Sequence, residues 1–226
     1  MTETNLSRRL RMVLSVVAIM LTVSSLAGCS LFVMAGKMIF GDPTIPSSFS
    51  ARTGINLTKD QKKLLVVCRT PYLVENAMPS LEYDLTDGVL RRLKQRGIKT
   101  VSPDVVAAWL DENGGTNNNP DRFAKEFDCD FIAIVEVTSL SFYEENSRDM
   151  FRGHALGNIR AFEVKNIGEE KRAAQIYSGE FTTEYPQFSP IAIHSMTERV
   201  FQKQFLDYLS QQIARHFHDY RVSDSI

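Results

Sequence analysis

Apolar and polar positions divide the chain into three regions. Residues 12–26 form an almost continuous apolar run, residues 41–48 are rich in proline and small polar residues, and residues 62–217 mix short apolar runs with periodic apolar positions. The last pattern is typical of strands that alternate with helices. The predicted parts are a leader, a tether and one folded domain, over residues 1–28, 29–61 and 62–220.

Short apolar runs in the folded part predict a sheet. The run FIAIVEV at 131–137 is the strongest of them, and we expect it at the centre of the sheet, buried on both faces. Two later runs flank the turn-forming residues 166–170 and predict an antiparallel hairpin, in which Gly157 marks a bulge or a close approach of two backbones. The predicted strands span residues 64–68, 98–101, 131–137, 153–165 and 174–184.

Helical periodicity appears between these runs. Leu81, Leu85, Val89 and Leu93 recur every four residues, between Pro79 and Gly97, and this spacing predicts a helix with one apolar face. The chain end carries a similar stripe, made of Ile193, Met196, Val200, Leu209, Ile213 and Phe217. The predicted helices span residues 79–97, 102–110, 121–127 and 190–217, and residues 49–58 are expected as an extended lead-in.

The order of these elements defines the fold class. It reads β-α-β-α-(α)-β-β-β-α, which predicts an α/β domain with a mixed sheet in two or three layers. Right-handed crossovers make the first three strands parallel, and the hairpin extends the sheet in the antiparallel sense. A long C-terminal helix then covers the sheet.

Composition changes this picture little, but it excludes one class of partner. Of 226 residues, 43% are hydrophobic and 23% are charged, as in ordinary globular proteins. The formal net charge is −1, so no basic surplus exists to attract nucleic acid.

The leader contains the most specific motif of the chain. Arg8, Arg9 and Arg11 precede the apolar run, which ends in the tetrad L-A-G-C at 26–29. This layout resembles the signal and lipobox of bacterial lipoproteins. The resemblance implies cleavage between Gly28 and Cys29, a diacylglyceryl group with palmitate-type chains on Cys29, and a lipid anchor in the cell envelope.

Two further observations bear on this anchor. Ser30 stands where an aspartate often retains lipoproteins in the inner membrane, so the resemblance implies an outer-membrane protein that faces the periplasm. The alternative is an uncleaved transmembrane helix, because residues 12–36 carry no charge and are long enough to span a bilayer.

The folded part also resembles a known group of envelope domains. Its segment DCDFIAIVEV at 128–137 and its segment AQIYSGE at 174–180 resemble two strands of the TolB N-terminal domain, LpoB and CsgG. The lipobox, the proline-rich linker and the tail helix together resemble uncharacterised lipoproteins of planctomycetes. The resemblance covers residues 62–217. It implies an α/β domain that binds partner proteins, and it supplies no catalytic residues.

Candidate chemistry elsewhere in the chain is sparse. Cys68 and Cys129 fall at opposite ends of neighbouring strands, so we expect two buried free thiols and no disulfide. Glu136 lies within the apolar central strand and needs a partner, which favours a structural role. The four histidines predict no metal site, and His216 and His218 are expected at a solvated helix end. No cofactor and no enzymatic activity are predicted.

These observations predict a lipid-anchored interaction or assembly module. The expected contact surface is the polar connection around residues 142–152, with Phe142, Tyr143, Arg148, Met150, Phe151 and Arg152. The alternative is a ligand-binding or enzymatic site at the carboxyl edge of the strands, near Thr70, Tyr72 and Glu136. Association of identical chains into a ring is a further alternative.

Overall fold

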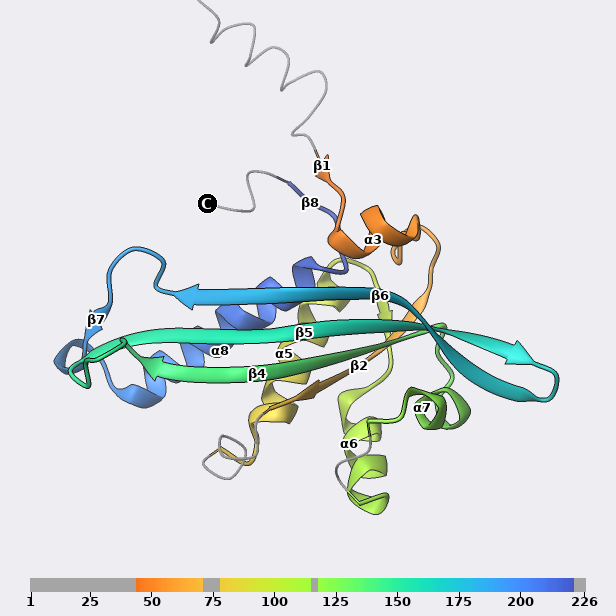
Figure 1. The fold of residues 1–226 in the computed structure, drawn as a ribbon, viewed down its shortest axis with the longest axis horizontal. Helices are drawn as coiled ribbons and strands as arrows, with labels where there is room; N and C mark the ends of the chain where they lie inside the picture. Colours follow the sequence, from red (N-terminus) through yellow and green to blue (C-terminus); the bar gives the residue numbers. More distant parts are fainter. Residues whose placement is uncertain (1–43, 71–77, 115–117, 222–226) are drawn as a thin grey trace, which may run out of the picture. The chain divides into compact units, whose positions relative to one another are not determined.

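A computed structural model describes residues 44–70, 78–114 and 118–221 (Figure 1). The chain divides into two compact units, Met1–Ile45 with Arg221–Ile226, and Pro46–Tyr220. Strand β1 (Thr44–Ile45) pairs with β8 (Tyr220–Arg221) in a two-stranded sheet. The predicted signal and Cys29 lie outside the described residues. Among the residues described, no helix has the length and apolar character needed to cross a membrane.

The larger unit is built on a six-stranded mixed sheet with the order β3-β2-β4-β5-β6, and β7 pairs with β5. Strand β2 runs parallel to β3 and β4, whereas β5 is antiparallel to β4 and β6. The predicted fold class is confirmed, with β4 in the middle of the sheet. The strands are β2 (Lys63–Arg69), β3 (Lys99–Thr100), β4 (Phe131–Tyr143), β5 (Met150–Ile167), β6 (Glu170–Tyr185) and β7 (Ile191–Ala192).

Strands β4 and β5 continue further than their apolar residues predict. An irregularity in the β4–β5 pairing just after Val137 shifts the alternation by one residue. Ser139 therefore lies on the same face as Glu136, and Leu140 packs on the core. Val137 pairs with Gly157, and a Cβ on Gly157 would lie 2.3 Å from the carbonyl oxygen of Glu136. The predicted close approach at Gly157 is therefore confirmed, because only glycine leaves room for the neighbouring backbone.

Helices cover the two faces of the sheet unequally. Helices α3, α5 and α8 supply the core on one face, which extends along the sheet from Leu64 to Phe151. Helices α6 and α7 cover the other face only over β2, the start of β4, the adjoining part of β5 around Phe162 and the start of β6 at Ala173. The helices are α3 (Ser48–Thr53), α5 (Leu81–Gln95), α6 (Pro103–Glu112), α7 (Pro120–Glu126) and α8 (Glu198–Arg215), with a 3₁₀ turn η1 (Ile193–Ser195).

The C-terminal helix begins later than predicted. The side chain of Thr197 accepts a hydrogen bond from the N–H of Val200 and caps α8, while the preceding residues form β7 and η1. Val200 is 47% exposed, so the predicted stripe is wrong near the helix start. The buried stripe recurs at four-residue spacing and consists of Phe201, Phe205, Leu209 and Ile213.

The segment before β2 is part of the fold, in contrast to the predicted lead-in. Phe49 of α3 is fully buried against the rings of Phe131, Tyr177 and Phe217. The N–H of Phe49 donates to the carbonyl of His216, so α3 is held to the end of α8. The compact unit therefore begins at Pro46, before the predicted boundary at residue 62.

At the end of α8, His218 is buried and His216 is partly buried, so the prediction of a solvated helix end is wrong. Nδ1 of His216 lies 2.9 Å from the hydroxyl of Tyr177, and His218 is 7% exposed. Burial lowers the pKa of both imidazoles, and Arg52 lowers that of His216 further. Both rings are therefore neutral in the folded protein near pH 7.

Phe49→Ala should lower the free energy of unfolding by about 3–5 kcal/mol, because it empties a fully buried aromatic site. Phe188→Ala is the matched control, since this ring is 91% exposed, and it should change stability by less than about 0.5 kcal/mol. Urea unfolding followed by circular dichroism measures both variants. Equal effects would show that α3 is not part of the core.

Stability should also fall with acidification below about pH 6.5, the ordinary histidine pKa. Burial holds the folded-state pKa of His216 and His218 below that value, so the unfolded chain takes up protons first and is favoured as the pH drops. Unfolding free energies at pH 7.5 and 5.5 measure the effect. The double variant His216→Gln/His218→Gln should flatten this dependence, and an unchanged slope would assign it to other groups.

Candidate functional site

The sheet has a polar face that no described helix covers. Along β4 the buried Ile132 and Ile134 are followed on the same face by Glu136, because alternate residues share a face. The residues of β5 and β6 that pair with this part of β4 lie on the same face and are also mostly polar. We define the open face as Glu136, Ser139 and Ser141 of β4, Arg152, His154, Leu156, Asn158 and Arg160 of β5, and Glu180, Thr182 and Glu184 of β6.

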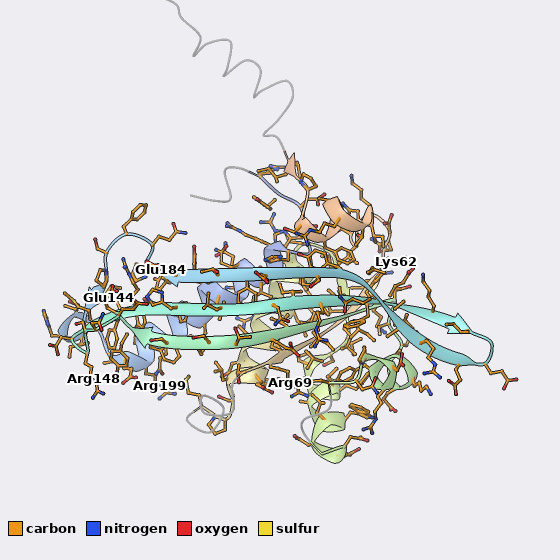
Figure 2. The ribbon with its side chains drawn as sticks, in the orientation of Figure 1. Lys62, Arg69, Glu144, Arg148, Glu184 and Arg199 are labelled. Atoms are coloured by element: carbon orange, nitrogen blue, oxygen red, sulfur yellow. The ribbon has the colours of Figure 1, made fainter. Side chains whose placement is uncertain are left out.

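A charged cluster lies at the far end of the open face. Nη1 of Arg152 lies 3.1 Å from Oε2 of Glu144 and 3.2 Å from Oε1 of Glu184. Nδ1 of His154 lies 3.9 Å from the second oxygen of Glu184. Figure 2 shows Glu144 and Glu184 at the same end of the sheet. One guanidinium thus serves two carboxylates, which leaves an excess of negative charge.

The cluster retains unused hydrogen-bonding groups. Nε of Arg152 and Nε2 of His154 are buried and have no partner among the described residues. The Arg152 side chain is only 16% exposed. Its guanidinium is held by the two carboxylates and by the carbonyl of Phe188, to which Nη2 donates at 3.0 Å. Unsatisfied buried polar atoms are costly, and they mark a place where a bound group could supply hydrogen bonds.

A wide cleft adjoins this cluster, with a volume of about 1040 Å³. It lies between the turn after β4 and the open face, and its walls include Tyr143, Glu144, Arg148, His154 and Thr182. Its volume is at the upper limit of small-molecule sites, which are mostly apolar. A cleft of this size, in which polar residues surround Leu156 and Ala155, suits a polypeptide segment better than a small apolar ligand.

Glu136 has the partner that its position requires. Its Oε1 accepts from Nη2 of Arg160 at 2.7 Å, and both side chains are about one third exposed. Arg160 also lies over the ring of Phe162. The carboxylate of Glu136 is therefore engaged in a cross-strand ion pair at the boundary between the covered and open parts of this face.

A second cavity of about 230 Å³ lies at the carboxyl end of β2, between α5 and α6. Glu82 organises it: its carboxylate lies 2.8 Å from Nη1 of Arg69 and accepts from the N–H of Thr70. Glu136 does not line this cavity, and Tyr72 lies outside the described residues. The structure thus brings Thr70 together with Glu82, a residue that sequence reasoning missed. The sequence feature that could have revealed Glu82 is its place as an acidic residue in the first turn of α5, next to the end of β2.

The two cysteines are buried free thiols, as predicted. Cys68 belongs to the core under α5 and α8, whereas Cys129 belongs to the core under α6 and α7. Burial raises the pKa of Cys68 to about 12 and that of Cys129 to about 11. Both thiols are therefore protonated at neutral pH and unsuited to nucleophilic chemistry.

The predicted contact residues lie together at one end of the sheet but differ in exposure. Arg148 and Met150 are exposed, and Tyr143 lines the cleft. Phe151 is 3% exposed and stacks on Phe201 at 4.9 Å, so it belongs to the core. Phe142 and Arg152 are partly buried, against Phe205 and in the charged cluster respectively.

The other candidate ligands do not assemble. His154 lies on the open face, and His194 is exposed in η1. Within the described ranges, no group of three or more His, Cys, Asp or Glu side chains is placed to hold a metal ion.

Arg152→Gln should destabilise the protein by about 1–2 kcal/mol, because it leaves two carboxylates close together without their shared cation. Arg148→Gln, four residues away and exposed, is the matched control and should change stability by less than about 0.5 kcal/mol. Thermal unfolding at low and high salt measures both. A salt-independent or equal loss would contradict an ionic role for Arg152.

No family model matches the sequence, and no curated protein matches it. Some solved structures are similar in part. Lipoprotein GNA1162 from Neisseria meningitidis is 15% identical over 68% of this chain and 96% of that chain, with a TM-score of 0.39. The PelC dodecamer from Paraburkholderia phytofirmans is 10% identical over 78% and 96%, with a TM-score of 0.40. The hypothetical protein CT253 from Chlamydia trachomatis is 11% identical over 69% and 97%, with a TM-score of 0.38. At such low identities and TM-scores, these likenesses do not establish a family or a function.

Proposed function

We propose that this protein is a lipid-anchored, non-enzymatic lipoprotein of the bacterial cell envelope, whose folded unit binds a partner protein through the open face. The observation that carries the proposal is the unequal covering of the sheet. Two helices bury one half of this face, and the other half presents the exposed Leu156 among charged side chains beside a cleft of about 1040 Å³.

The chemistry of the open face suits such an interface. Apolar Leu156 is 47% exposed and is flanked in register by Ser139 and Thr182. Around this centre lie the ion pair of Glu136 and the Arg152 cluster. An apolar centre with a polar rim is the usual anatomy of a protein–protein interface.

The anchor is the second part of the proposal and rests on the sequence. The tetrad at 26–29 places Cys29 for lipidation, and two acyl chains on one residue anchor a protein stably. Ser30 supports an outer-membrane location with the folded unit in the periplasm. The tether after Cys29 then lets the open face meet partners near the membrane.

The cavity beside Glu82 supports a second candidate, a small-ligand site. Its walls combine apolar side chains with the Arg69–Glu82 ion pair, as in such sites, although about 230 Å³ is small. A thermal-shift screen with nucleotides, sugars and muropeptides distinguishes the two functions, because a ligand that binds the folded state raises the melting temperature.

The test of the proposed function places a photo-crosslinking amino acid at Leu156 in the full chain, produced in a double-membraned bacterial host with palmitate labelling. A discrete protein adduct and a labelled chain in the membrane fraction are expected. The matched position is Ile167 at the tip of the β5–β6 hairpin, which is 65% exposed and should give no discrete adduct.

Cys29→Ser should abolish the palmitate label and release the chain from the membrane fraction. Cys129→Ser is its control and should keep both, because Cys129 is a buried thiol within the fold. A full-length unlabelled product from the parent chain would refute the anchor. Adducts of equal yield at Leu156 and Ile167 would refute the open face as the partner site.

A further inference from the structure

We propose that the outer edge of β6, from Glu180 to Glu184, accepts an added β-strand from a basic, extended segment of a partner protein. The inference rests on the proposed function, because it names the element and the chemistry by which a partner binds beside the open face. It requires three properties of this edge: free backbone groups, an accessible position and a charge that selects the occupant.

Strand β6 is the last strand in the sheet order, and its edge is visible along the top of the sheet in Figure 1. Two side chains cap part of that edge. The N–H of Ala173 donates to Oδ1 of Asp121 in α7 at 2.7 Å, and the guanidinium of Arg52 in α3 donates to the carbonyl of Ser178. Because these partners lie outside the β5–β6 ladder, they identify residues whose backbone groups face outward.

The alternation of backbone directions along β6 identifies further residues whose N–H and C=O groups face outward. In an antiparallel pair, every second residue directs its N–H and C=O away from the neighbouring strand. The β5–β6 pairing has no register shift between Ser178 and Tyr185, so Glu180, Thr182 and Glu184 also face outward. Within the described part of the chain, the backbone groups of these three residues make no hydrogen bond outside the ladder.

The fold thus caps this edge at two places and leaves the third open. Exposed strand edges are normally covered or blunted, because they pair with other chains. Asp121 and Arg52 do so at Ala173 and Ser178, and the pKa of Asp121 is lowered chiefly by its hydrogen bond from Ala173. A free stretch beside two capped ones has the properties of a docking edge.

Charge selects the occupant. Glu180 and Thr182 are exposed, Glu184 is half-buried, and all three side chains lie on the open face. Glu184 shares Arg152 with Glu144, so this row keeps a surplus of carboxylate. Lysine or arginine at positions i and i+4 of an added strand would lie opposite Glu180 and Glu184, with a β-branched residue opposite Thr182.

The same geometry disfavours a second copy of this chain. If two β6 strands paired antiparallel about Thr182, Glu180 of one copy would lie opposite Glu184 of the other. Like charges directly opposite in a sheet are destabilising. On the reverse side of the strand, Phe181 and Thr183 are buried, and Oγ1 of Thr183 lacks a hydrogen-bond partner among the described residues. An added strand with valine or threonine there would fit the apolar surroundings.

The test uses the full ¹⁵N-labelled chain in detergent micelles and the ten-residue peptide KVTVKVTVKV. Its lysines at i and i+4 and its threonine at i+2 share one face, and its valines lie on the reverse side. Amide hydrogen exchange is measured residue by residue with and without the peptide. We expect slower exchange, by more than about tenfold, at Glu180, Thr182 and Glu184, whose N–H groups gain partners. Exchange at Phe181 and Thr183 should stay unchanged, because their N–H groups already belong to the ladder.

Variants separate strand addition from simple charge attraction. Glu180→Gln/Glu184→Gln should weaken peptide binding by about tenfold, because two cross-strand charge pairs are lost. Glu169→Gln, in the hairpin turn, is the matched control and should leave binding unchanged. Thr182→Pro should abolish binding, since it removes an outward N–H, and circular dichroism verifies its fold. A peptide N-methylated on the residues whose N–H groups face β6 provides the same test without altering the protein.

Three results would overturn the inference. Protection without alternation would place the peptide on the open face and not on the edge. Equal affinity for the peptide with glutamate in place of lysine would remove the charge argument. Protection of the same amides without peptide, rising with protein concentration, would assign the edge to a second copy. None of these results alters the palmitate label or the adduct at Leu156, so failure here is distinguishable from failure of the proposed function.

Discussion

The double burial of β4 is the constraint on which the rest of the structure depends. From Phe131 to Val135 both faces of this strand are covered, so helices must lie on both sides of the sheet. From Glu136 onward only one face remains apolar, and the strand continues as a half-buried one. This change of pattern coincides with the limit of the area that α6 and α7 cover and with the start of the polar face. The covered and the open halves of this face therefore both follow from the residue pattern of β4.

The polar half of the sheet is ordered, although no described helix covers it. Cross-strand ion pairs hold its side chains: Glu136 with Arg160 near the middle, and Arg152 with Glu144 and Glu184 at the end. Such pairs stabilise little when exposed, but they fix the positions of long side chains. A partner would thus meet a prearranged surface and lose less side-chain entropy on binding.

Much of the fold follows from local sequence patterns, and the differences have physical causes. The stripe from Leu81 to Leu93 and the run at 131–137 are dictated by burial on defined faces, so periodicity found them. Helix α3 has one buried residue, Phe49, and its packing partners are remote in sequence, so no period revealed it. Val200 is apolar yet exposed, because the face of α8 that meets the core is the one with Phe201 and Phe205. The Arg152 cluster joins side chains from β5, from β6 and from the turn after β4. Its formation depends on how these strands pair, which the sequence pattern does not reveal.

The contact between α3 and the end of α8 has a consequence for the time order of folding. The N–H of Ser47 donates to Oδ1 of Asp219, a contact that spans 172 residues. A ribosome produces the binding site of α3 last, when nearly all of the chain has emerged. Until then Phe49 has no pocket formed by Phe217 and Tyr177 to enter. The first segment of the folded unit, α3, is thus the last to pack against the rest. A chain truncated before residue 216 would leave α3 unfolded.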